Sequence, residues 1–140
     1  MTETYKITSA HRFGYFIAIL VNGALFFVMN NLHKWPIPFL TQDFKNVLWA
    51  INLALAAAAF INFVFLFFDP KWFRSLMHAI QSCFGLLSVY TFYRIFPLDL
   101  PNNMIAQWGR IGLLVVMGLT CLGILIELIQ FFHGAIKLED

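Results

Sequence analysis

Residues Leu119–Gly134 read LTCLGILIELIQFFHG, an apolar run that holds a single carboxylate, Glu127. The run belongs to a longer stretch, Ile111–Phe132, in which Glu127 is the only Asp, Glu, Lys or Arg. One helical crossing of a bilayer needs about 20 predominantly apolar residues, which matches the length of this stretch. The stretch therefore predicts a transmembrane helix with one acid inside it.

The rest of the chain has the same character. Hydrophobic residues make up 61% of its 140 residues and charged residues only 11%, about half of the charged share of a soluble domain. Three further stretches contain no Asp, Glu, Lys or Arg: Phe13–Leu32, Asn46–Phe68 and roughly Ser75–Tyr93. Because backbone groups in hydrocarbon must satisfy their own hydrogen bonds, each stretch is expected to be helical. Four crossings leave no room for a soluble domain.

We predict an all-α membrane protein, a four-transmembrane-helix bundle that forms one domain over residues 1–140. Its helices are expected at about 13–32, 46–68, 73–95 and 105–133. The segment MNNLHKWPIP after the first helix has no small-residue cleavage site, so this helix is expected to remain as an anchor. In FFDPKWF, Asp69 is expected to cap the third helix and Pro70 to fit its first turn, which predicts a tight hairpin of the second and third helices.

The distribution of basic residues gives the predicted orientation. An even number of crossings puts both termini on one side, here called side A, and the opposite side is called side B. Side A then holds Lys6, Arg12, Lys71, Arg74 and Lys137, and side B holds Lys34, Lys45, Arg94 and Arg110. Because Lys and Arg are enriched on the cytoplasmic side, this small excess favours cytoplasmic termini. We predict a multi-pass protein that is integral to the plasma (inner) membrane.

The two connections on side B resemble each other. His33–Pro36 reads HKWP and Arg94–Pro97 reads RIFP, and each places an aromatic residue before a proline at the end of a predicted helix. With a small gap in the later connection, Asn62 aligns with Glu127. The pattern indicates a duplicated helical hairpin whose two copies have the same, parallel orientation, unlike an inverted repeat.

Several other protein classes are not expected. The net charge is +2 and no polybasic run is present, so nucleic acid is not an expected partner. Cys83 and Cys121 show no CxxC spacing, so no metal site is expected. No GxSxG, HExxH or glycine-rich phosphate loop is present, and only His78 lies well inside a predicted helix. We therefore expect neither an enzyme nor a cofactor such as haem.

Polar side chains on the predicted helices fall at similar depths. Counted from the side-A ends of their helices, Glu127, Asn62 and Gln81 should lie roughly 8–9 Å deep, with His78 one turn nearer side A. A carboxylate at such a depth is costly when ionised, so Glu127 should be protonated, paired or in contact with water. Protonated and hydrogen-bonded to Asn62 or Gln81, it would hold helices together. In contact with water, it could bind a cation or carry a proton.

Two functions follow from these two interpretations of Glu127. The first is an oligomeric channel or small transporter for an ion or small solute, in which Glu127 binds the ion or proton and Asn62, Gln81 and His78 support it. The second is a non-catalytic membrane scaffold or accessory subunit of a larger complex. The expected partners are the lipid bilayer, further copies of the chain and a membrane-protein partner. Small residues four apart are the candidate contact faces: Gly14 with Ala18, Ala54 with Ala58 and Ala79 with Cys83.

Three segments, IPFLTQDFKNVLW, LFFDPKWF and YRIFPLDL, carry a resemblance that covers nearly the whole chain. In these segments the sequence resembles an uncharacterised family of small four-helix prokaryotic integral membrane proteins. The resemblance implies a four-helix fold and a membrane compartment. It carries no activity and no site residue over to this chain.

Overall fold

The computed structural model describes residues 8–137, so Lys6, which the count of basic residues placed on side A, lies outside the described residues. Within residues 8–137 the chain forms four α-helices and no strand. They are α1 (Ser9–Asn31), α2 (Lys45–Phe65), α3 (Lys71–Ile95) and α4 (Asn103–Ile136), with two 3₁₀ turns, η1 (Leu32–Lys34) and η2 (Gln42–Phe44), in the first connection. The predicted all-α class is confirmed, and each predicted helix is present with its ends shifted by a few residues.

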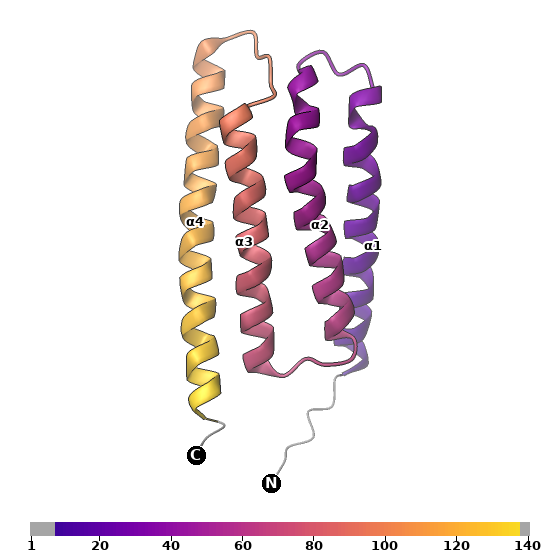
Figure 1. Ribbon diagram of the computed structural model, residues 1–140, viewed down its shortest axis with the longest axis vertical. Coiled ribbons are helices and arrows are strands. Elements are labelled where there is room, and N and C mark those ends of the chain that lie inside the picture. The colour runs from indigo at the N-terminus through magenta and orange to yellow at the C-terminus, as the bar shows by residue number, and fades with distance from the viewer. Residues whose placement is uncertain (1–7, 138–140) are drawn as a thin grey trace.

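The helices run up and down in the order of the sequence, so that α1 and α3 point one way and α2 and α4 the other (Figure 1). Each helix packs chiefly on its neighbours in the sequence, α1 on α2, α2 on α3 and α3 on α4. α1 and α4 contain no buried residue, because each has only one main neighbour. The packing is therefore more open than that of a closed bundle.

The core lies where α2 meets its two neighbours. The buried side chains of α2 are Val47, Ala50, Ala58, Ile61 and Phe65, and α3 adds Ala79. Alanine lets helix backbones approach closely and so increases van der Waals contact. Ala58 and Ala79, two of the small residues named as candidate contact faces, are thus buried inside the chain. Gly14 remains open, since no atom lies within 4 Å of the position that a Cβ would take.

At the side-B end, the two long connections pair with each other. Thr41 N donates to Pro97 O at 3.0 Å, and Asp99 N donates to Phe39 O at 2.9 Å. An isolated antiparallel bridge lies between these two bonds. The bonds join the α1–α2 hairpin to the α3–α4 hairpin, although the two connections are far apart in the sequence.

Phe96 ends α3 in a left-handed backbone conformation. Its φ is 44° and its ψ is 68°, a region that costs a residue with a Cβ about 1–2 kcal/mol. The Phe96 ring compensates by packing, because Arg110 Cζ lies 4.7 Å from its centre and Gly109 leaves space for the ring beside α4. Phe96 therefore fixes the direction in which the chain leaves α3.

Three segments of the described residues are long and apolar enough to cross a membrane: Ser9–Lys34, Gln42–Phe65 and Asn103–Ile136. These segments support an association with a membrane. α3 is not among them, although its 25 residues would span about 37 Å at 1.5 Å per residue. Polar side chains such as Lys71, Arg74, His78 and Gln81 lower its hydropathy. α3 lies between α2 and α4, where a helix has less surface to expose.

Candidate functional site

The packing of α3 against α4 fixes the level of Glu127 within the protein. Near the side-A end, Ser75 Oγ donates to Gln130 Oε1 over a long 3.5 Å. One turn further along α4, a Cβ placed on Gly134 would lie only 3.0 Å from Trp72 Cβ, so the two helices are in close contact there. Together these contacts define the antiparallel register of α3 and α4.

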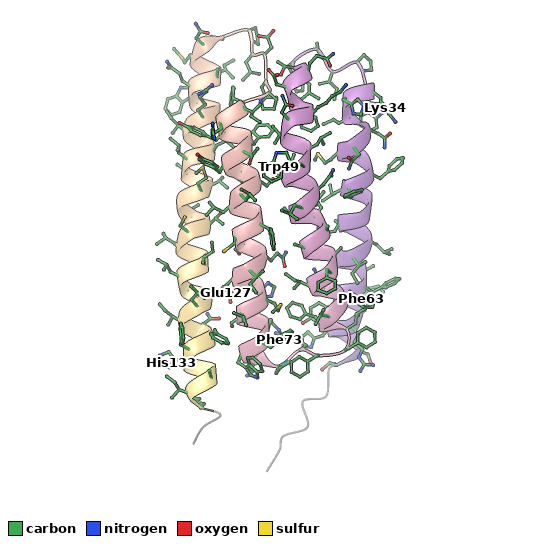
Figure 2. All side chains as sticks on the ribbon, viewed as in Figure 1. Lys34, Trp49, Phe63, Phe73, Glu127 and His133 are labelled. Atoms are coloured by element: carbon green, nitrogen blue, oxygen red, sulfur yellow. The ribbon has the colours of Figure 1, made fainter. Side chains whose placement is uncertain are left out.

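This register places Glu127 at the level of His78. His78 follows Ser75 by three residues on α3 and Glu127 precedes Gln130 by three residues on α4, and in antiparallel helices these two steps lead to the same height. Glu127 is half-buried and lies where α4 borders α3 (Figure 2). Gln81, which the sequence placed level with Glu127, lies about one turn further toward side B.

The two remaining site residues connect this level to α2. The His78 ring lies 5.5 Å from the ring of Phe65, measured between centres, so His78 is in contact with α2. Asn62 lies nearly one turn before Phe65 on α2, and its Nδ2 donates to Ala58 O at 2.8 Å within the same helix. The structure thus brings the four predicted site residues to neighbouring levels on three helices, without a hydrogen bond between any two of them.

Glu127, His78 and Gln81 have unused capacity for hydrogen bonds. None of the three makes a hydrogen bond to another of residues 8–137, and Gln81 Oε1 is buried without a partner. By contrast, Asn30 and Asn52 exchange two side-chain bonds between α1 and α2, at 2.7 and 3.0 Å. A buried polar group without a partner costs about 1–3 kcal/mol. A further hydrogen-bonding group would therefore be stabilising at this level of α3 and α4.

Two clefts between the helices are lined by none of Glu127, His78, Gln81 and Asn62. One of about 460 Å³ lies between α2 and α3 near side B and is lined by Trp49 and Arg94 among others. Another, of about 360 Å³, is apolar and lined by both Cys83 and Cys121, from α3 and α4. Among residues 8–137, no three His, Cys, Asp or Glu side chains are grouped so that they could hold a metal ion. The site residues therefore lie at helix interfaces rather than around a cleft.

A second polar cluster, which the sequence analysis missed, lies at the side-A end. Asp69 is 1% exposed, and its carboxylate accepts hydrogen bonds from the Tyr15 hydroxyl of α1 and from Arg74 of α3. Arg74 Nε lies 2.7 Å from Asp69 Oδ1, and Arg74 Nη2 pairs with Oδ2. The prediction that Asp69 caps α3 is wrong, because Pro70 is the N-cap residue and no side chain caps the helix.

The Asp69 carboxylate bonds to Tyr15 and Arg74 instead of capping α3, because these partners stabilise it more. A carboxylate that is removed from water needs a paired charge and further hydrogen bonds, which a cap alone does not supply. The short spacing of Asp69 and Arg74 in the sequence could have suggested their ion pair. Tyr15 could not have been found in this way, since it is 54 residues away. The cluster fastens α1 to the turn between α2 and α3.

No protein-family model matches the chain, and neither a curated protein nor a solved structure matches it. The resemblance to a family of four-helix membrane proteins therefore stays a prediction. Function has to be inferred from the arrangement of the residues.

Proposed function

We propose that the chain is a multi-pass membrane protein that crosses the bilayer four times as a four-helix bundle. α1, α2 and α4 are apolar enough to cross, and α2 and α4 run in the same direction (Figure 1). If both of them cross, α3 must return through the bilayer between them. Large side chains support a lipid-facing exterior, since Phe13 and Phe60 are 66% and 67% exposed. In this proposal, side A faces the cytoplasm and the membrane is the plasma (inner) membrane.

The proposed activity is the passage of a proton or small cation through an oligomeric channel or small transporter. The observation that supports it is Glu127, which is half-buried in an apolar helix and makes no hydrogen bond within residues 8–137. A carboxyl group in this setting needs a proton, a cation or water. His78, at the same level on α3, and Gln81, one turn away, would supply further polar contacts to the ion or proton. Asn62 would support them from α2. Because these groups lie around no cleft of their own, a second copy of the chain would complete the path.

The alternative is a non-catalytic scaffold or accessory subunit of a larger complex. The observation that favours it is the long unburied surface of α1 and α4, which could receive another membrane helix. In this case Glu127 would pair with a polar group of the partner. Neither proposal includes an enzymatic reaction or a cofactor.

A flux measurement with Glu127→Gln separates the two proposals. The full chain is reconstituted into liposomes that contain a pH-sensitive dye, and proton or cation flux is started with a potassium diffusion potential. Glutamine keeps the shape of the side chain and removes its charge, so flux should fall by about tenfold or more. Thr120→Val is the matched control, because Thr120 lies on the same helix and its hydroxyl bonds only to Val116 O of that helix.

Flux that is equal in the wild type and in Glu127→Gln would contradict ion passage through Glu127. The scaffold proposal expects a different pair of results. It expects no flux from the wild type above empty liposomes, and it expects Glu127→Gln to release a partner that the wild type retains during purification in mild detergent.

A further inference from the structure

An open cleft lies between α3 and α4 at their side-A ends. Its volume is about 460 Å³, and its lining includes Lys71, Trp72 and Ser75 of α3, Gln130 and His133 of α4, and Lys137, which directly follows α4. No acidic side chain lines it among the described residues. Glu127 does not line the cleft, because it lies on α4 about one turn closer to side B than Gln130. Neither proposed function uses the cleft.

The lining side chains are donors that suit a phosphate group. Lys71 and Lys137 are exposed basic residues, one on each wall of the cleft. Ser75 and Gln130 lie between the two walls, where Gln130 accepts a bond with its Oε1 and so keeps its side-chain N–H groups for a ligand. Phosphate oxygens accept strong hydrogen bonds from ammonium, hydroxyl and amide groups.

The surrounding charges reinforce this preference for an anion. Within residues 8–137, Asp69 is the acid nearest to the cleft in the sequence, and its carboxylate is buried against Tyr15 and Arg74 instead of facing Lys71. Glu139 and Asp140 lie outside the described residues. α3 begins at Lys71, and no side chain caps its first turn. The free N–H groups and the dipole at the start of a long helix add positive potential. Among residues 8–137, Lys71 and Lys137 are thus the Lys, Arg, Asp or Glu side chains that line this cleft.

The position of the cleft favours a lipid as the source of the phosphate. Trp72 is half-buried in it and packs against Phe131, with ring centres 6.2 Å apart, and tryptophan is enriched at the level of lipid headgroups. On α4, Phe132 and Ile136 are each 61% exposed beside the basic residues. A lipid held by its phosphate could therefore place its acyl chains along exposed apolar side chains of the same helix.

We propose that this cleft binds the phosphate of an anionic phospholipid headgroup, an inference that rests on the membrane location proposed above and not on ion passage. Lys71 and Lys137 hold the phosphate from opposite walls, and Gln130 donates to it with the side-chain N–H groups that its bond with Ser75 leaves available. A zwitterionic lipid binds more weakly, because its choline group meets the same two lysines.

The test is a lipid titration of the purified full chain in mild detergent, followed by native mass spectrometry. The probes are phosphatidylglycerol, phosphatidylcholine and inorganic phosphate. A basic residue near an anionic headgroup changes affinity about fivefold, so Lys71→Gln/Lys137→Gln should weaken phosphatidylglycerol binding by about 25-fold. The matched control is Lys34→Gln/Lys45→Gln, which removes two exposed lysines from side B and should leave this affinity within about twofold.

Three results would overturn the assignment. Equal weakening by the two double variants would mean a general charge effect, and equal binding of phosphatidylglycerol and phosphatidylcholine would remove the role of anionic charge. Inorganic phosphate that binds as tightly as phosphatidylglycerol would identify a free phosphate as the ligand. Thermal unfolding of both variants establishes that they are folded, and the flux assay with Glu127→Gln in phosphatidylcholine liposomes tests ion passage separately.

Discussion

Replacing Asp69 by asparagine tests whether the buried cluster at side A fastens the helices together. Three donors converge on the Asp69 carboxylate, namely the Tyr15 hydroxyl and Nε and Nη2 of Arg74. A hydrogen bond to a charged group contributes about 1.5–3 kcal/mol. Asparagine keeps one acceptor oxygen and loses the charge and the second acceptor, so the equivalent of one to two such bonds disappears.

The expected loss in the free energy of unfolding is about 2–3 kcal/mol for Asp69→Asn. Two charged hydrogen bonds at their full strength would give a larger loss of free energy. The expected loss is smaller because the Arg74 side chain is 31% exposed, so water screens part of its interaction with Asp69. Tyr15→Phe should cost less, about 1.5 kcal/mol. It removes the bond to Asp69 and keeps the contact of the ring with Phe65, whose centre lies 5.3 Å away.

The assay is reversible unfolding in mixed micelles with increasing dodecyl sulfate, followed by far-ultraviolet circular dichroism. Asp99→Asn is the control, because Asp99 is an exposed acid of the second side-B connection and should change stability by less than about 0.5 kcal/mol. An Asp69→Asn loss no larger than that of Asp99→Asn would refute the role given to the carboxylate. If Tyr15→Phe lowered the free energy of unfolding as much as Asp69→Asn, the conclusion that Arg74 contributes more than Tyr15 would be refuted.

Three further predictions concern the helix contacts. A short, membrane-permeant bifunctional thiol reagent should link Cys83 to Cys121 within one chain, because both line one cleft; fragments still joined after cleavage of the chain would show the link, Cys121→Ser is the control that lacks the second thiol, and fragments that separate in the wild type would contradict the register. Phe96→Ala should destabilise the protein by about 1 kcal/mol more than Phe96→Gly, since only alanine keeps the strain of a positive φ, and equal unfolding midpoints would argue against that strain. In a double-mutant cycle, replacing Asn30 and Asn52 together by leucine should cost no more than either single change, because each amide bonds the other; additive losses would mean that the two amides act independently.

The helices themselves could be predicted because apolar length is a local property of the sequence. The prediction of 73–95 for the third helix agrees with Lys71–Ile95, and Pro97 and Pro101 mark the connection that follows. The fourth helix extends to Ile136 rather than to residue 133. The prediction followed the apolar run, which closes at Phe132, whereas the contact of Gly134 with Trp72 supports α4 beyond that run.

The level of the site residues could be predicted only within one helical turn. Depth was counted on the assumption that the third and fourth helices end at the same height. Gly134 lies against Trp72, so α4 extends beyond the start of α3, and Glu127 meets the level of His78 instead of Gln81. Such an offset is set by which side chains interlock between two helices, and a count along a single sequence contains no information about it.

Asp69 shows where a local rule gives the wrong partner. An Asp before Pro at the start of a helix is a good cap by local criteria, and the sequence gives no sign of Tyr15. Only tertiary packing brings a hydroxyl from α1 to that turn, and the pair of charged bonds with Arg74 then outweighs a cap. Long-range partners of this kind are absent from any local pattern.

The order in which the helices pack has a consequence for how the protein is made. α2, α3 and α4 each pack on the helix that precedes them in the chain. When one of these helices leaves the ribosome, the preceding helix has already been synthesised and can bind it. Contacts between neighbours in the chain close quickly, with little entropy lost in bringing distant parts together. Within residues 8–137, the bonds between the two long connections join segments that are separated by α2 and α3, and the bond of Tyr15 to Asp69 joins segments that are separated by α2. α4 follows α3 in the chain and packs chiefly on it, so its docking requires mainly the surface of α3.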